Sequence, residues 1–404
     1  MPTVNDMIVF QASAILNSIQ HQATGQAALT ASTPGEFISV AQSALRTGYD
    51  PIVNAMSQVW GRTVFSVRDY AAPFARLEWD ADRWGNAWRK ISFVDHDVMD
   101  DERFTYPVAY DANQTPPTGN GLSVDMFKIH KPEVQQLAFY GQSVYEDCET
   151  IFRDNLDVAF TGPEEFVRFN SAEVQVRSNK LEQYRETTRR SILANACASL
   201  ISENNSDRVI HLVTEYNSQT GSSLTSTTVY DPANFPDFVR WLYGFIGTLA
   251  RMFSRRSNLF QTVVNSKVVN RHTPPDRLNI YMYAPLLDQI NSRVRSVTYH
   301  DDILNDANWE GVDFWQAIKS AKSINLTPTY TNTSGQAYTP GSAVTSSVVV
   351  GLLFDDEAMG YSMVNTWTSV TPFVSNGGYW NDWYHANIRT KFDMTEKMAV
   401  LLMD

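Results

Sequence analysis

Cysteine is nearly absent from this chain, with only Cys148 and Cys197 among 404 residues. Their spacing fits no metal-ligand motif, and one possible bridge does not indicate an oxidising compartment, so both are expected to be buried thiols. No apolar run approaches the ~20 residues of a membrane span, and the N-terminus lacks the basic and apolar regions of a secretory signal. We therefore expect a protein that folds in a cytoplasm.

Basic residues and catalytic signatures are also scarce. Lysine and arginine number 32 against 44 aspartates and glutamates, which gives a net charge of −12 without any block of bases. This balance argues against a protein that grips nucleic acid directly. The chain has no P-loop, GxSxG elbow, HExxH pair or dinucleotide fingerprint. We expect no enzyme activity, no cofactor and no metal.

Two acidic clusters come nearest to reactive chemistry. Residues 95–97 (Asp-His-Asp) and the acids at 100–102 could supply metal ligands, but a solvated acidic turn is the preferred interpretation. The adjacent carboxylates at 355–357 could suggest acid–base work, yet neighbours in sequence rarely converge on one atom. A turn at the end of a strand is the preferred interpretation there.

Helical periodicity marks several separate segments of the chain. Residues 8–60 contain patterns for two short amphipathic helices, with breaks at 33–35 and 48–51. The strongest helix is predicted over 163–204, because Pro163 suits its first position and apolar residues recur every three or four positions. Further helices are predicted over 235–253 and 286–294.

The remaining patterns predict strands and loops, so the fold class is α+β. Residues 77–131 mix aromatic and charged residues with prolines and are predicted to form a projecting hairpin. The run 278–283 reads as a strand before a helix, and 327–347 as a loop. The last 57 residues are predicted to form a β-meander, with even positions from Trp380 packed and odd positions facing solvent or a neighbour.

Exposed-looking tryptophans leave two functions open. Flat rings beside carboxylates could line a carbohydrate cleft, as in a sugar-binding protein or glycosidase. They could equally anchor a protein interface. The residue pattern does not separate these alternatives, which rest on the following positions: Trp79, Trp84, Trp88, Trp309, Trp315, Trp380 and Trp383.

Three segments carry a family resemblance. Residues 377–385 (Gly-Gly-Tyr-Trp-Asn-Asp-Trp-Tyr-His), followed by 397–400, resemble the closing strands of major head proteins of small short-tailed phages of the phi-29 and picovirus type. Residues 139–143 (Phe-Tyr-Gly-Gln-Ser) are similar to the segment that precedes the spine helix in these head proteins. Residues 84–90 (Trp-Gly-Asn-Ala-Trp-Arg-Lys) are similar to the rising strand of their extended loop. The additional immunoglobulin-like domain of some such phages is not expected after Asp404.

The resemblance implies an HK-97-type capsid fold. Its expected parts are an N-terminal arm and start of the peripheral domain, an extended β-hairpin loop, a peripheral domain with a long spine helix, an axial α/β domain and a closing β-meander of the peripheral domain. These are assigned, in order, to residues 1–75, 76–139, 140–206, 207–345 and 346–404.

The implied function is a major capsid protein that self-assembles into hexamers and pentamers and encloses double-stranded DNA in an icosahedral or prolate head. Expected partners are other copies, a scaffolding protein and a portal, with no membrane; assembly is expected in the bacterial cytoplasm, and the product in the virion. Another virion structural protein, such as a minor head component, remains an alternative. Assembly contacts are predicted at Trp84, Trp88, Arg89, Phe104, Tyr106, Trp383 and His385.

Overall fold

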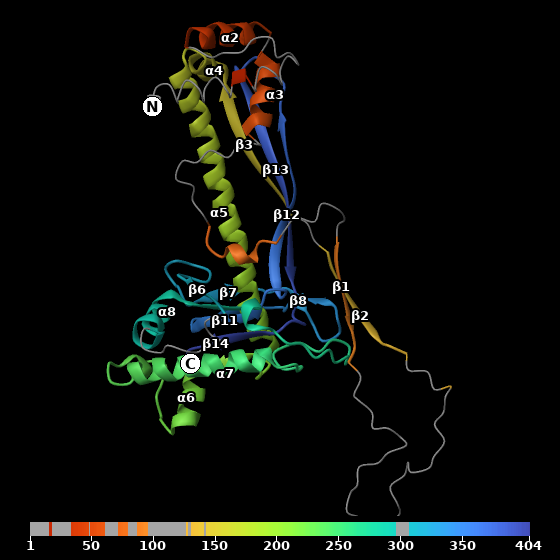
Figure 1. Cartoon of the computed structure of the whole chain (residues 1–404), viewed down its shortest axis with the longest axis vertical. Coiled ribbons are helices and arrows are strands. Elements are labelled where there is room, and N and C mark those ends of the chain that lie inside the picture. Colours follow the sequence, from red (N-terminus) through yellow and green to blue (C-terminus); the bar gives the residue numbers. More distant parts are fainter. Residues whose placement is uncertain are drawn as a thin grey trace, which may run out of the picture.

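The molecule is elongated, with a helical cap, a long shaft and a compact mixed domain (Figure 1). The computed structural model describes residues 16–17, 34–47, 49–60, 72–79, 87–95, 127, 131–140, 143–295 and 307–404. Helices and strands both contribute, which confirms the α+β class. Within these ranges, no helix is both long and apolar enough to cross a membrane.

Helix α5 (Pro163–Glu203) is the spine of the shaft. Its 41 residues span about 60 Å at ~1.5 Å per residue. Pro163 occupies the first turn together with Glu164 and Glu165, which favour the positive end of the helix dipole. The helix ends at Asn204, whose φ of 50° is left-handed. The helix predicted over 163–204 is confirmed.

A three-stranded antiparallel sheet runs along α5 (Figure 1). It consists of β12 (Met359–Val370), β13 (Tyr379–Phe392) and β3 (Ser143–Phe152), in that order. On β13 the even positions from 380 to 388 are buried and the odd ones are half-exposed, as the alternation predicted. The prediction fails beyond this point, because Arg389 and Lys391 are buried.

Short helices cap the far end of the shaft. They are α2 (Pro34–Thr47), α3 (Tyr49–Trp60) and α4 (Arg153–Ala159). Phe37, Phe166 and Trp380 share a buried cluster there, and the Trp380 indole donates to the Asp50 carboxylate at 2.6 Å. The second helix predicted within 8–60 is confirmed as α2, whereas the first lies mostly outside the described residues. Helix α3 begins at Tyr49, inside the break expected at 48–51, so most of that expected break is helical.

The compact domain is built on a five-stranded mixed sheet. Its order is β4 (Val209–His211), β14 (Met398–Leu402), β11 (Val349–Asp355), β5 (Leu278–Tyr283) and β6 (Asn308–Val312). Leu353 and Leu401 pack towards α6 (Leu212–Thr220), α7 (Phe235–Ser254) and α8 (Ala284–Ile290). Leu352 and Val400 pack towards the end of α5, so helices bury both faces.

Two sequence predictions about this region are wrong. The last 57 residues do not form one meander, because β11 and β14 pair with β5 and β4 while β12 and β13 pair in the shaft sheet. Residues 346–404 therefore contribute to both sheets. The expected loop over 327–347 contains β8 (Tyr330–Thr331), β9 (Ala337–Tyr338) and β10 (Val344–Ser346).

Smaller elements complete the framework. Strand β10 pairs with β7 (Ile324–Leu326), and β8 pairs with β9. Helix α8 begins two residues earlier than predicted and continues as a π-helical turn, Asn291–Arg295. Short 3₁₀ turns occupy Ala75–Leu77, Thr228–Tyr230 and Pro275–Arg277.

Candidate assembly interface

A two-stranded hairpin leaves the side of the molecule where the shaft meets the compact domain (Figure 1). It is formed by β1 (Ala87–Phe93) and β2 (Val134–Tyr140), which pair antiparallel over seven residues. The sequence predicted a projecting hairpin in this part of the chain. Its described strands stand outside both sheets, so it needs separate anchoring.

Lys90 anchors the hairpin to the compact domain. Its ammonium group forms ion pairs with Asp393 and Glu396, and Arg271 pairs with the same Glu396 at 2.7 Å. Asp393 is fully buried; burial alone would raise its pKa, but the adjacent Lys90 holds the pKa below the ordinary value. A buried carboxylate needs such a cation, so the hairpin base is fixed to the domain.

Aromatic rings reinforce this base. The Trp88 ring lies 5.3 Å from that of Trp79, and the Arg389 guanidinium lies 5.6 Å from the Trp88 ring centre. Lys391 similarly lies 4.9 Å from the Trp79 ring centre and 5.4 Å from that of Phe139. These contacts explain why Arg389 and Lys391 are buried, against the alternation of β13. Burial also lowers the pKa of Lys391.

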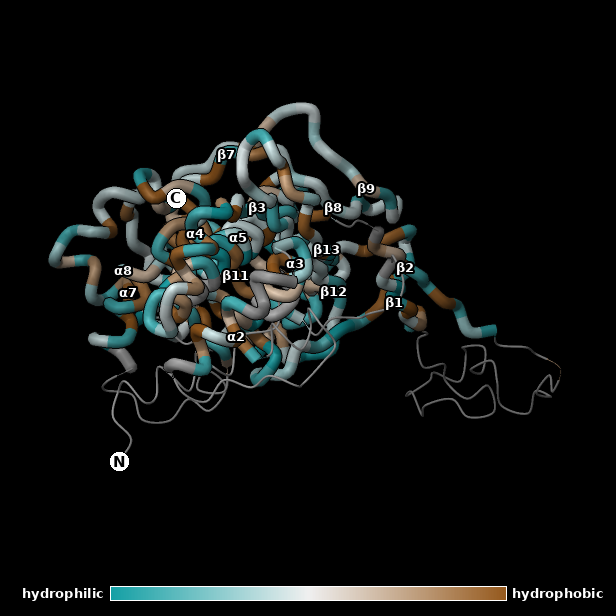
Figure 2. Tube along the Cα trace, turned by 90° about the horizontal axis from the view of Figure 1, so that it is seen from above, coloured by the Kyte–Doolittle hydropathy of each residue, from teal (hydrophilic) through white to brown (hydrophobic). Residues whose placement is uncertain are grey.

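The outer face of the hairpin carries exposed apolar side chains, together with the exposed polar residues Arg89 and Gln136. Ile91, Phe93 and Val134 are 60%, 66% and 45% exposed, and Phe93 lies directly across from Val134. We call these three residues the hairpin strip. Figure 2 shows hydrophobic residues on β1, away from the central body. A hydrophobic cross-strand cluster in water indicates a surface that a partner covers.

The sequence did not single out the hairpin strip, although a signal existed. Arg89, Ile91 and Phe93 occupy alternate positions, which places them on one face of a strand. The segment around these residues mixes aromatic, charged and proline residues, so the apolar face of the strand was not recognised from the sequence. Arg89, predicted as a contact residue, is exposed next to the strip.

The predicted contacts on β13 lie on the open face of the shaft sheet. His385 stacks on Trp367 at 4.9 Å between ring centres and lies 6.3 Å from Trp383. Trp367 is 41% exposed, whereas Trp383 and His385 are half-buried. The row is therefore presented to the outside by a rigid sheet. Three further predicted contact residues, Trp84, Phe104 and Tyr106, lie outside the described residues.

A groove of about 1650 Å³ separates the hairpin from the spine. Leu137 and Phe139 of β2 line one side, and Tyr184 and Arg190 of α5 line another. Arg190 is held by Glu186 at 2.7 Å and by the Phe314 carbonyl oxygen at 2.6 Å. The groove wall is thus built from fixed side chains.

Arg189 joins the spine to the segment that leads into the hairpin. Its guanidinium donates to the carbonyl oxygens of Ala72 at 2.7 Å and Pro73 at 2.8 Å, and to Glu78 at 2.8 Å. Tyr361 of β12 donates to the same Glu78 carboxylate at 2.7 Å. Burial opposes ionisation of Glu78, but Tyr361 and the nearby arginines hold its pKa below the ordinary value. Sequence reasoning missed this network, whose members are far apart in the chain.

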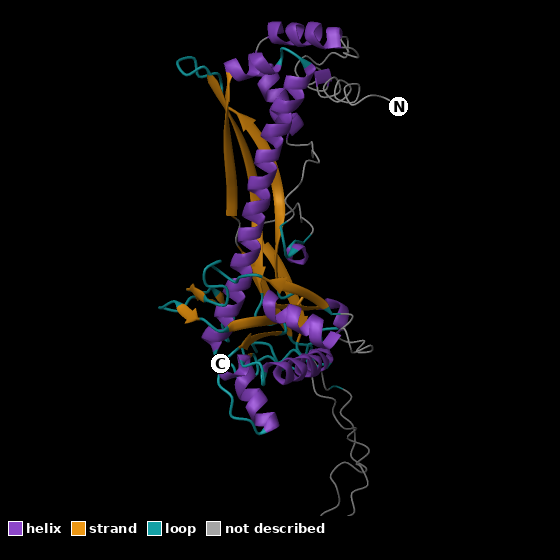
Figure 3. Ribbon diagram, turned by 90° about the vertical axis from the view of Figure 1, so that its left-hand side faces the viewer, coloured by secondary structure: helices purple, strands orange, loops and turns teal. Residues whose placement is uncertain are grey.

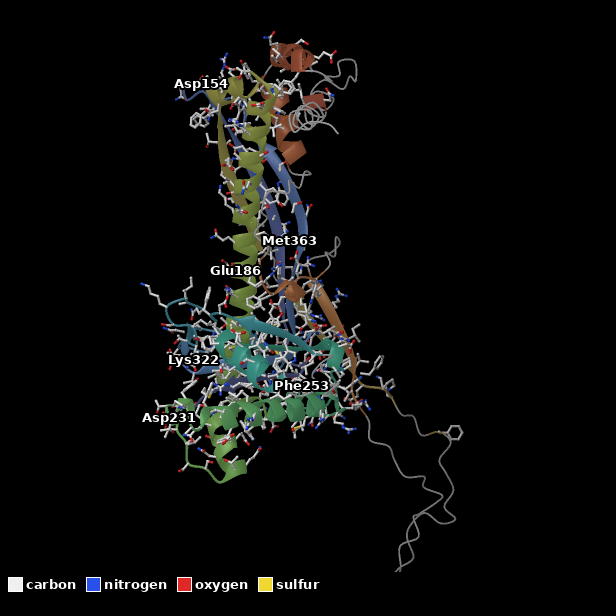
Figure 4. The ribbon with its side chains drawn as sticks, turned by 60° about the vertical axis from the view of Figure 1, so that its left-hand side comes forward. Asp154, Glu186, Asp231, Phe253, Lys322 and Met363 are labelled. Carbon is white, nitrogen blue, oxygen red and sulfur yellow. The ribbon has the colours of Figure 1, made fainter. Side chains whose placement is uncertain are left out.

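A charged seam lies higher in the shaft, between α5 and the strands β3 and β13. Arg177 forms a buried ion pair with Asp382 at 2.7 Å. Lys180 lies 3.5 Å from Asp147 and 3.9 Å from Glu149. Figure 4 shows side chains along this contact, above the level of Glu186 and Met363. Three acids face two bases in these pairs, and Glu173 adds a fourth acid. Burial and the neighbouring Glu149 raise the pKa of Glu173 to about 7.

Glu173→Gln should stabilise the chain in a pH-dependent way. The ordinary pKa is 4.5, so the folded state holds more protons than the unfolded state between pH 4.5 and about 7. Wild-type stability therefore falls as pH rises through this window, whereas the neutral Gln is unaffected. Urea unfolding should show little difference at pH 4.5 and a gain on the order of 1 kcal/mol at pH 8. Glu165→Gln, at an exposed site, is the control; an equal pH-dependent gain there would contradict the explanation.

The described residues offer little for catalysis. Among them, no group of histidine, cysteine and carboxylate side chains could hold a metal ion. The Asp95 carboxylate instead accepts hydrogen bonds from the Arg256 guanidinium and from the backbone N–H of Asn270. The other residues of 95–97 and 100–102 lie outside the described ranges. The acids at 355–357 form a strand-end turn, as predicted, with Glu357 paired to Arg277.

The thiols form no disulfide. Cys197 is buried as expected, but Cys148 is exposed, because it lies on the open face of β3. The expectation of two buried thiols is therefore wrong for Cys148.

Comparisons with known proteins converge on phage capsids. A family model described as Phi29-like phage major capsid protein matches residues 14–401. A chain from the structure of the head fiber and inner core protein gp22 of native bacteriophage P68 is 9% identical, with a TM-score of 0.51 over 85% of this chain and 87% of that one. A chain from the capsid of Staphylococcus phage Andhra is also 9% identical, with a TM-score of 0.48 over 84% and 86%. The search of curated proteins found no match.

Proposed function

Because the chain belongs to the Phi29-like phage major capsid protein family, we propose that its copies form hexamers and pentamers that close into an icosahedral or prolate head around double-stranded DNA. Family membership makes the chain a capsid-forming structural protein of the virion, and its HK-97-type fold agrees with that role. The sugar-binding alternative has no comparable support. The minor-component alternative is also not favoured, since the matching family is that of the major protein.

The hairpin strip is the observation that best supports contacts between copies. A patch on one subunit that fits a different patch on the next generates a ring when the rotation closes. The hairpin offers an apolar face with a base held by Lys90, so it can reach a neighbour without losing its own position. The Trp367, Trp383 and His385 row offers a second rigid surface. We propose that both are covered in the shell.

The net charge of the chain and the needs of shell assembly suggest how it relates to DNA, a scaffolding protein and a portal. With a net charge of −12 the chain repels DNA, which suits a container whose genome must be spooled in and released. We propose that the shell forms in the bacterial cytoplasm with a scaffolding protein and a portal, and that it has no enzymatic activity. The domain division drawn from the sequence remains part of this proposal.

Shell formation is directly testable. Co-expression of the chain with the scaffolding protein of its own phage should yield capsomers or closed shells in negative-stain micrographs. The chain should also be the most abundant protein of purified particles. A product that stays monomeric under assembly conditions, or a minor band in particles, would contradict the proposal.

A further inference from the structure

A second groove, of about 800 Å³, runs between α7 and the segment that contains β4 and α6. Helix α7 and the neighbouring α6 lie at the end of the molecule opposite the helical cap (Figure 3). The floor of the groove includes Trp241, Phe245, Leu249 and Met252, which recur every three or four residues on one helix face. Trp241 and Phe245 stack at 4.8 Å between ring centres, and Met252 is 44% exposed. We call this feature the α7 groove.

The α7 groove lies on the flank of α7, beside the face that packs in the core. Phe238, Leu242 and Ile246 are fully buried and belong to the core under the five-stranded sheet. Trp241 and Phe245 are half-buried against this core and Leu249 belongs to it, so the groove floor extends the apolar core to the surface. Gly244 lines the α7 groove and has no atom within 4 Å of where a Cβ would stand, so the floor stays open.

The carboxylates are the charged side chains that line the α7 groove. Among the described residues that line it are Asp207 and Glu215, but no lysine or arginine. His211 also lines it and lies 2.7 Å from the Asp404 carboxylate, which brings a third acid to the rim. Such a rim attracts a cationic partner and disfavours a second copy of a chain whose net charge is −12.

We infer that the α7 groove binds an amphipathic helix of another protein, with apolar side chains against Trp241 and Phe245 and lysine or arginine beside Asp207 and Glu215. The apolar floor from Trp241 to Met252 is ~16 Å long, which matches about three helical turns of the partner. The inference goes beyond shell closure, which requires only contacts between copies of this chain.

A designed peptide tests the inference on the unassembled full-length chain. The probe is a fluorescein-labelled helix of about 14 leucine and lysine residues with leucine at helical spacing, titrated by fluorescence anisotropy. Saturable binding is expected, and Asp207→Asn with Glu215→Gln should weaken it roughly tenfold or more. Gly244→Arg should abolish binding, since it places bulk and positive charge on an open floor.

The matched control removes the same charge elsewhere. Asp154→Asn with Glu164→Gln changes exposed acids at the opposite end of the molecule, where Asp154 is labelled in Figure 4. This control should bind the probe as the wild type does; equal weakening by both double variants would overturn the inference. Absence of saturable binding would also overturn it. If the wild-type chain sediments as a dimer and Gly244→Arg makes it monomeric, the inference is also overturned, because a second copy of this chain then occupies the groove. Shell formation is read separately and can succeed or fail in either case.

Discussion

Aspartate at both Ile91 and Phe93 should abolish shell assembly while leaving the isolated chain folded. Both side chains are more than half exposed, so the substitutions remove little packing within the chain. In an assembled shell the same positions would place unpaired charges in an apolar contact, at a cost of several kcal/mol per subunit. Particle yield in sedimentation should fall below detection, with an unchanged far-ultraviolet circular dichroism spectrum and melting temperature.

The conservative changes Ile91→Val and Phe93→Leu provide the control, because they keep the hairpin strip apolar. Shells should form with them at close to wild-type yield. Assembly by the double aspartate variant would show that the hairpin strip is not covered in the shell. A large drop in its melting temperature would show instead that the hairpin packs within the chain.

Arg189→Met should destabilise the chain by about 2–3 kcal/mol, because buried hydrogen-bond acceptors lose their charged donor. The carbonyl oxygens of Ala72 and Pro73 would lose their donor, and Glu78 would keep the Tyr361 hydroxyl and the nearby charge of Arg185. The loss should appear as a lower urea midpoint. Residues 72–79 should also become accessible to protease, since Arg189 ties them to the spine.

Arg168→Met on the same helix is the matched control. The Arg168 side chain is 73% exposed and pairs with Glu165 at 3.4 Å, so its removal should cost about 1 kcal/mol or less. Similar losses for the two variants would contradict the role assigned to the Arg189 network. Arg189→Lys should recover only part of the stability, because one ammonium cannot reproduce the planar set of donors.

Local signals made the spine helix predictable. Pro163, the two acids behind it and the apolar spacing all lie within one segment, and each acts on the backbone nearby. The strand over 278–283 was also readable, since a short apolar run between polar turns suffices. The β13 alternation held from Trp380 to Ile388 for the same reason.

Long-range pairing could not be read from those signals. The apolar run over β11 predicts that this strand is buried, but it does not predict that β14 and β5 are its neighbours in the sheet. Likewise, Arg389 and Lys391 look like solvent-facing residues until Trp88, Trp79 and Phe139 are placed over them. The Arg189 network and the hairpin strip depend on the same kind of distant contact. Family resemblance provided the fold, but individual contact residues required the structure.

A cryo-electron microscopy reconstruction of assembled particles tests the central claim most directly. The account predicts that Ile91, Phe93 and Val134 are buried against a neighbouring copy in every ring. It also predicts that the Lys90 anchor to Asp393 is kept in each subunit. Particles in which the hairpin strip faces solvent, or packs only on its own subunit, would contradict the claim that this hairpin joins the subunits of the shell.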